Sequence, residues 1–180
     1  VRGDPQWRYE LHVKAGDLAA YLNFTGAVPA WRPGAGKVYA GVPGQAPDGY
    51  FAWLVGIPHG TVEGFLTYRG KIHPVQGSCY HDHRWSNLAL SEVFHHWCLG
   101  RARIGETTFV FLELTGSAAY GGQKIPAMLL AQGSQPALAD CANLSLAEQD
   151  FKPDPRGRSY PTGLDGRWSN DHQSIVFALR

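Results

Sequence analysis

Alternation of apolar and polar residues is the feature that most limits what this chain can fold into. In WRYELHVK (7–14) every second residue is apolar, which is the period of a strand with one buried face. The segment DLAAYLNFTG (17–26) follows the turn pair Ala15-Gly16, so the two segments predict a hairpin. The segments YFAWLVGIP (50–58), GTVEGFLTYRG (60–70) and KIHPVQGSCYHDHRW (71–85) predict a meander with a tight turn at Arg69-Gly70.

The second half of the chain continues this pattern. SEVFHHWCLGRARI (91–104) and TTFVFLELTG (107–116) predict two strands joined by a turn at Gly105-Glu106, and SIVFALR (174–180) predicts a last strand. Helical periodicity is confined to LADCANLSLAEQ (138–149), which is equally compatible with an edge strand. We therefore expect an all-β fold, an antiparallel barrel or sandwich.

Two stretches rich in proline and glycine interrupt the strands. Residues 27–49 predict a long loop over the mouth of a cavity, and residues 150–172 predict a loop or linker. We expect residues 1–86 to form a first β-meander. Residues 87–180 are then a second β-rich segment that contains the irregular 150–172 loop.

The low charge of the chain limits its partners. Charged residues make up 17% and the net charge is +1, so no basic field would attract nucleic acid. No apolar run approaches the roughly 18 residues of a membrane span. The sequons at Asn23 and Asn143 lean slightly toward a secreted protein, and the start at Val1 with a single methionine, Met128, indicates a processed or trimmed chain.

The three cysteines offer little chemistry on spacing alone. Cys79, Cys98 and Cys141 form no CxxC pair, and the simplest interpretation is small buried side chains. One disulfide stays open as an alternative.

The stretch GSCYHDHRWSN (77–87) concentrates groups that handle protons. On a strand, Tyr80, Asp82 and Arg84 share one face, while His81, His83 and Trp85 share the other. The strand 91–104 carries a second set that includes His95, His96 and Trp97. If both strands line one cavity, imidazoles, indoles and a carboxylate converge there. A carboxylate in such a water-poor cavity has a raised pKa and can act as a general acid.

Two other interpretations of this stretch stay open. His81-x-His83 has the spacing of a metal pair on a β-strand, but the glutamate that a cupin places four or five residues later is missing, so we predict no metal. Alternatively, Asp82 pairs with Arg84, Arg101 or Arg103 in a purely structural network. Motifs of hydrolase elbows and nucleotide-binding loops are absent from the sequence.

Four motifs carry a resemblance to a known family. They are Gly60-Thr-Val-Glu-Gly64, the turn Arg69-Gly-Lys71, the stretch from Val75 to Trp85, and Trp97-Cys-Leu-Gly-Arg-Ala-Arg-Ile-Gly105. Together they resemble the hydroxyneurosporene synthase/carotenoid hydratase-like family, whose lipocalin-like fold is shared with fungal Diels–Alderases. The resemblance covers residues 50–116 closely and 7–41 more loosely. The chain departs from the family pattern at four positions: Cys79 and Ser86 replace glycines, Arg84 replaces an asparagine, and His95 replaces a tryptophan.

The resemblance implies an enzyme without a cofactor that acts on a hydrophobic terpenoid or polyketide. Family members are usually twice as long, with two lipocalin-like halves, so this chain is expected to be a portion of such a protein or a half completed by another chain. The favoured activity is a Diels–Alder or related pericyclic cyclisation, and the alternative is hydration of an alkene. A third possibility is a non-enzymatic carrier of a small apolar ligand.

Residue roles follow from the same resemblance. In a cyclase, His81, His83 or Tyr80 would donate hydrogen bonds to the substrate. In a hydratase, Asp82 would protonate the alkene beside an aromatic wall. The residues expected to bind substrate are Trp53, Tyr68, Arg84, Trp85, His95, Trp97 and Arg101.

Overall fold

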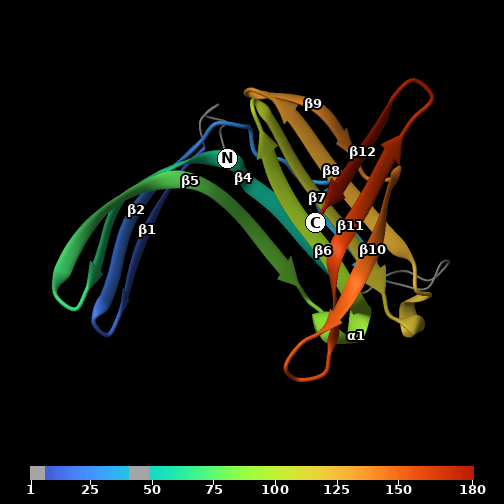
Figure 1. The fold of residues 1–180 in the computed structure, drawn as a ribbon, viewed down its shortest axis with the longest axis horizontal. Helices are drawn as coiled ribbons and strands as arrows, with labels where there is room; N and C mark the ends of the chain where they lie inside the picture. The colour runs from blue at the N-terminus through green and yellow to red at the C-terminus, as the bar shows by residue number, and fades with distance from the viewer. Residues whose placement is uncertain (1–6, 41–48) are drawn as a thin grey trace.

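Three open antiparallel sheets make up the computed structural model of this protein, which describes residues 7–40 and 49–180 (Figure 1). The first sheet has the order β1-β2-β4-β3. Strands β2 and β3 pair with different parts of the long strand β4, and β5 pairs with β4 along the edge opposite to them. Its strands are β1 (Arg8–Ala15), β2 (Leu18–Gly26), β3 (Lys37–Ala40), β4 (Gly49–Tyr68) and β5 (Lys71–Ser86). The all-β prediction and the first hairpin are therefore confirmed.

The second and third sheets follow in chain order. The second sheet has the order β6-β7-β8-β9 and the third β10-β11-β12. A single helical turn, α1 (Leu90–Val93), precedes β6. The remaining elements are β6 (Phe94–Ile104), β7 (Thr107–Gly116), the 3-10 turn η1 (Ala118–Tyr120), β8 (Lys124–Gln132), β9 (Gln135–Asp140), β10 (Leu144–Pro153), β11 (Ser159–Ser169) and β12 (Ser174–Leu179).

Strand β4 differs from its predicted form. The segments 50–58 and 60–70 are one continuous strand and not two, because the Pro58 region is taken up by register shifts between Val55 and Gly60. Proline lacks the N–H that a regular ladder needs and is tolerated at such irregularities. At Gly60 an added Cβ would lie 2.2 Å from the Thr25 carbonyl oxygen, so glycine lets β2 approach closely.

The predicted loop 27–49 also contains regular structure. Trp31 forms an isolated bridge with Val55, and Lys37–Ala40 forms β3 on the edge of β4. Residues 41–48 of this loop lie outside the described residues. The possible helix over 138–149 is strand instead, formed by the end of β9 and the start of β10.

The prediction of an irregular loop over 150–172 is wrong. Most of it belongs to β10 and β11, which pair from Leu144↔Trp168 to Pro153↔Ser159. Pro161 fits because β12 pairs only with residues 164–169, so β11 needs no second ladder at that proline. Gly166 fits because a Cβ there would lie 1.9 Å from the Phe177 ring.

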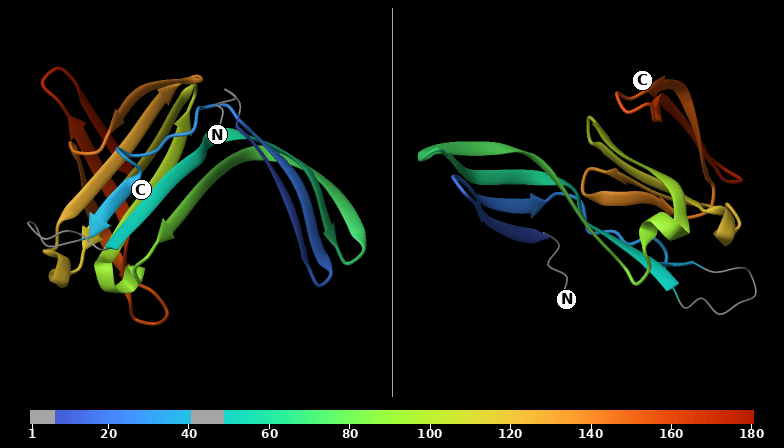
Figure 2. Two further views of the ribbon diagram at one scale, coloured as in Figure 1. Left: turned by 180° about the vertical axis from the view of Figure 1, so that it is seen from behind. Right: turned by 90° about the horizontal axis from the view of Figure 1, so that it is seen from below.

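The second sheet is the middle layer between the other two, as Figure 2 shows from below. Alternate side chains of β7 enter two different cores. Val110 and Leu112 pack with Trp53 and Val55 of the first sheet, while Phe111 packs with Trp168 of the third. The far ends of β1, β2, β4 and β5 extend beyond these layers as a curved arm (Figure 1).

The core couples the two predicted segments. The first cluster joins Phe51 of β4 to Val93 and Val110, so residues before and after position 87 share one interior. The division into a lipocalin-like β-meander over residues 1–86 and a second β-rich segment over residues 87–180 stays a prediction. Cys79, Cys98 and Cys141 are all free thiols, and none of the described helices is long and apolar enough to cross a membrane.

Candidate functional site

Asp82 lies at the centre of a polar network between the first and second sheets. Its Oδ2 accepts hydrogen bonds from Trp53 Nε1 at 3.0 Å and from the Tyr80 hydroxyl at 3.0 Å. The Arg84 guanidinium donates to the same oxygen from Nη2 at 2.8 Å and from Nε at 3.2 Å. Among the described residues, no hydrogen bond reaches Oδ1.

Strand geometry explains how these groups meet. Tyr80, Asp82 and Arg84 alternate along β5 and so share one face, as the sequence predicted. Trp53 lies opposite Arg84 on β4, and its side chain is 3% exposed. The Asp82 side chain is 19% exposed, so the carboxylate is sheltered but not sealed from water.

The Asp82 carboxyl is held ionised, which corrects the expectation of a raised pKa and a general acid. Burial acts to raise the pKa of Asp82, but the hydrogen bonds from Arg84, Trp53 and Tyr80 outweigh burial and place it below its ordinary value. The Tyr80 pKa is raised by burial, and the Asp82 charge and hydrogen bond raise it further. At neutral pH the site therefore holds an aspartate anion beside a neutral phenol.

Two cavities adjoin this network. The first, of about 290 Å³, is lined by Tyr80, Leu99, Gly100 and Arg101, and the Arg101 guanidinium lies 5.1 Å from the centre of the Tyr80 ring. The second is an apolar space of about 120 Å³ that Trp53 helps to line, well below the ~300 Å³ at which ligand pockets begin. The larger cavity is the better place for a reacting group.

The two histidines of the HDH stretch do not join Asp82. They project from the opposite face of β5, where the His81 ring lies 4.4 Å from the Tyr9 ring. The His83 ring lies 5.2 Å from the Trp85 ring, and both side chains are exposed. Within the described part of the chain there is no cluster of three or more histidine, cysteine or acidic residues that could hold a metal.

Three further candidates lie apart from the network. Tyr68 is 48% exposed on the arm, at the end of β4 and about 40 Å of strand away from Val55. His95 sits in a register shift of β6, and its Nδ1 lies 2.8 Å from His96 Nδ1. Trp97 shares the strand face of Leu99 and Arg101, but its side chain is 49% exposed. Of the predicted set, Tyr80, Asp82, Arg84, Trp53 and Arg101 come together.

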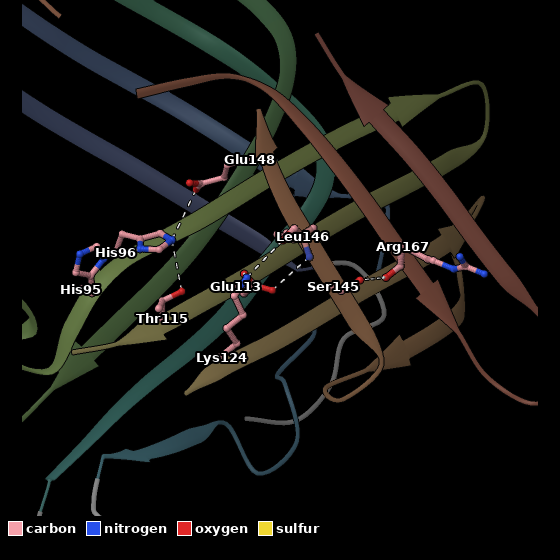
Figure 3. Close-up of polar contacts among 9 residues, drawn as sticks. All are labelled: His95, His96, Glu113, Thr115, Lys124, Ser145, Leu146, Glu148 and Arg167. Atoms are coloured by element: carbon pink, nitrogen blue, oxygen red, sulfur yellow. Dashed lines mark hydrogen bonds and ion pairs between the residues drawn. The ribbon is translucent and has the colours of Figure 1, made fainter. Parts of the chain in front are cut away.

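Sequence reasoning missed a second polar cluster, which lies between the second and third sheets (Figure 3). Glu113 on β7 is 4% exposed, and its carboxylate receives Lys124 Nζ at 2.7 Å and the Leu146 N–H at 3.3 Å. Nearby, His96 Nε2 lies 3.8 Å from Glu148 and 3.4 Å from the Thr115 hydroxyl. The signal was present, because Glu113 alternates with Phe109 and Phe111 on a face that must be buried.

Removing the charge of Lys124 should destabilise the fold. Lys124→Met leaves the Glu113 carboxylate buried with one backbone donor, and we expect the free energy of unfolding to fall by about 1–3 kcal/mol. Urea unfolding measures the change. The double variant Glu113→Leu/Lys124→Met should recover most of the loss, and Lys152→Met on exposed β10 is the matched control. Equal midpoints for Lys124→Met and the control would contradict a stabilising ion pair.

Comparisons with known proteins support the fold. No family model and no curated protein matches the chain. Two of the similar solved structures are as follows. The crystal structure of a Nitrosomonas europaea protein provisionally assigned as AttH matches with a TM-score of 0.64 at 20% identity. The match covers 88% of this chain and 49% of the Nitrosomonas chain. The crystal structure of kievitone hydratase from Nectria haematococca matches with a TM-score of 0.63 at 14% identity. This match covers 91% of this chain and 49% of the hydratase chain.

These similarities identify the fold of the chain but not its family or its activity. It spans about half the length of both solved structures, and at these identities the similarity is one of fold. The lipocalin-like all-β architecture expected from the motifs agrees with both. The hydroxyneurosporene synthase/carotenoid hydratase-like family itself stays a prediction from the motifs. The chain therefore belongs to the lipocalin-like fold that an AttH-type protein and a hydratase share.

Proposed function

We propose that this chain provides the active site, or one part of it, of a hydratase that adds water to a carbon–carbon double bond of an apolar substrate. The observation that carries the proposal is the Asp82 carboxylate, which has three donor side chains on Oδ2 and, within the described part of the chain, no hydrogen bond on Oδ1. The similarity in fold to kievitone hydratase supports the reaction class. The chemistry of the site supports it independently.

An ionised, oriented carboxylate suits a general base. Asp82 Oδ1 would accept a proton from water while the water oxygen bonds to one carbon of the alkene. The electron pair of the double bond moves toward the α carbon and onto the conjugated carbonyl oxygen, which gives an enolate. Asp82 then gives its proton to the α carbon, so one water is added across the double bond and the carboxylate is regenerated.

The charges around Asp82 favour a conjugated alkene over an isolated one. Protonating an isolated alkene creates a carbocation, which the Arg84 and Arg101 guanidinium groups would repel. Negative charge on a carbonyl oxygen is stabilised by the same two cations. The substrate class that fits is an α,β-unsaturated carbonyl compound with an apolar body in the cavity of about 290 Å³ beside Tyr80.

The expected cycloaddition has less support. Neither the AttH-type protein nor kievitone hydratase is named as a cyclase, and the histidines expected to donate hydrogen bonds to a cyclase substrate lie on the opposite strand face from Asp82. A non-enzymatic carrier remains the alternative from another class, and the products of one incubation separate it from the enzymes.

Incubation with α,β-unsaturated ketones in ¹⁸O-labelled water tests the proposal. We expect products heavier by one labelled water, with the label on the carbon β to the carbonyl, and none from the matched saturated ketones. Liquid chromatography with mass spectrometry provides the readout. Products of unchanged mass would indicate cyclisation, and binding without any product would indicate a carrier; either result contradicts hydration.

A further inference from the structure

A second pocket lies next to the Tyr80 cavity, on the other side of Arg101. It has a volume of about 320 Å³ and is lined by Pro58, His59, Ser78, Arg101, Arg103 and Thr108 together with Ala102. Arg101 also lines the Tyr80 cavity, so one residue borders both spaces. A ligand that occupies the Tyr80 cavity can therefore extend a group past Arg101.

The pocket is electropositive. Arg101 contacts the Tyr80 ring, and within the described chain it has no ion pair with an acidic side chain. Arg103 donates to the Gly105 carbonyl at 3.0 Å and lies 3.5 Å from Glu106, whose side chain is 69% exposed. Two arginines thus line the pocket, while Glu106, the acidic partner of Arg103, is exposed and is not one of the residues that line it.

The neighbouring histidine responds to this field. Burial lowers the pKa of His59, and the charges of Arg103 and Arg101 lower it further, while Glu106 acts in the opposite direction. His59 is consequently neutral at pH 7 and adds no positive charge of its own. Its ring nitrogens are available as one donor and one acceptor.

A buried hydroxyl lacks a partner in the same wall. Thr108 on β7 is 2% exposed, and its Oγ1 has no hydrogen-bond partner among the described residues. Buried polar atoms in folded proteins are almost always paired, and Thr108 is one of the residues that line this pocket, so its unpaired hydroxyl supports the presence of an acceptor there in the bound state. A carboxylate is acceptor-only and takes bidentate hydrogen bonds from arginine.

We propose that this pocket, defined by Arg101, Arg103, His59, Ser78 and Thr108, binds the carboxylate of an organic ligand whose apolar part occupies the Tyr80 cavity. The inference rests on the proposed function only in calling that ligand a substrate. It narrows the substrate class to apolar compounds that carry an acidic group. The Arg101 guanidinium is the main anchor, and the hydroxyls of Thr108 and Ser78 complete the donor set.

Binding of cinnamate and of its neutral analogue cinnamyl alcohol tests the inference. We expect calorimetric titration to show cinnamate binding about tenfold or more tighter than the alcohol, the scale of a charge-assisted hydrogen bond. Arg101→Gln should lose that selectivity. Thr108→Val, which removes only a hydroxyl, should weaken cinnamate binding several-fold. Arg156→Gln in the β10–β11 turn is the matched control and should change neither affinity.

A second readout follows His59. An anion offsets the field of the two guanidinium groups, so cinnamate should raise the pKa of His59 in an NMR titration and cinnamyl alcohol should not. Equal affinities for acid and alcohol, or equal affinities in Arg101→Gln and Arg156→Gln, would overturn the inference.

Failure of the proposed function would look different from failure of this pocket. Asp82→Asn should leave cinnamate affinity and the His59 response unchanged while it removes hydration. Charge-selective binding with no hydration of any unsaturated ketone would uphold the carboxylate pocket and reject the hydratase.

Discussion

Asp82→Asn is expected to lower the rate of water addition by about 10²-fold or more while substrate affinity changes little, the usual effect of removing a positioned proton-transfer group. Asparagine keeps the size of the side chain and one acceptor oxygen for Trp53 and Tyr80. It cannot take a proton from water, so the loss falls on the chemical step. Steady-state kinetics with an α,β-unsaturated ketone that the wild-type protein hydrates measure kcat and KM separately.

The control for this variant is another carboxylate that is paired with an arginine. Asp165 on β11 receives Arg180 Nη2 at 2.6 Å and lies in the third sheet, away from the cavities. Asp165→Asn should leave kcat and KM unchanged. If both variants lose the same activity, or if Asp82→Asn raises KM and leaves kcat intact, Asp82 is not the base.

The pH dependence of the wild-type protein follows from the lowered pKa of Asp82. The folded pKa of Asp82 lies below its ordinary value of about 3.9, so Asp82 contributes stability that is present above that value. This stability is lost as the pH falls through the folded pKa. The rate should be level from neutral pH down to about pH 5 and decline only in stronger acid, and a titration of Asp82→Asn should lack this loss of stability.

The face pattern of the HDH stretch could be predicted from the sequence because it depends on neighbours two residues apart. Alternation on β5 places Tyr80, Asp82 and Arg84 together, and the pairing of Asp82 with Arg84 is local in the chain. Trp53 could not be assigned as a donor in advance. It lies 29 residues from Asp82, and its register depends on the shifts around Ile57.

The ionisation of Asp82 was beyond sequence reasoning for a related reason. Burial and hydrogen bonding act on its pKa in opposite directions, and only the number of donors on Oδ2 decides which effect is larger. The same limit applies to His81 and His83. Alternation predicts their shared face, but not that this face meets Tyr9 and solvent instead of a cavity.

The composition of residues 150–172 led to the wrong prediction of a loop, because the glycine and proline there fit the packing of regular strands. Residues 150–172 look irregular because regular strands avoid these residue types. Here Gly166 makes room for the Phe177 ring, and Pro161 lies where only one neighbouring strand pairs. The apolar residue that should have indicated burial in this segment is Trp168.

Trp168→Ala should be among the most destabilising single substitutions in the chain. The side chain is 1% exposed and packs in the core cluster of Phe111, Met128 and Leu144, which joins the third sheet to the second. Truncation removes the buried ring and leaves a cavity, so we expect the free energy of unfolding to fall by about 3–5 kcal/mol. Urea unfolding with an unchanged m-value measures this loss.

Tyr160→Ala provides the comparison within the same strand, because Tyr160 is also aromatic but 46% exposed. Because Tyr160 does not belong to the core cluster that contains Trp168, the tyrosine variant should change stability by less than about 1 kcal/mol. A small loss in both variants would mean that residues 150–172 do behave as a loop in solution. A large loss in Trp168→Ala together with a small loss in Tyr160→Ala would show that β11 is a core strand. Truncating a side chain in a surface loop leaves no buried cavity and so would not produce this difference.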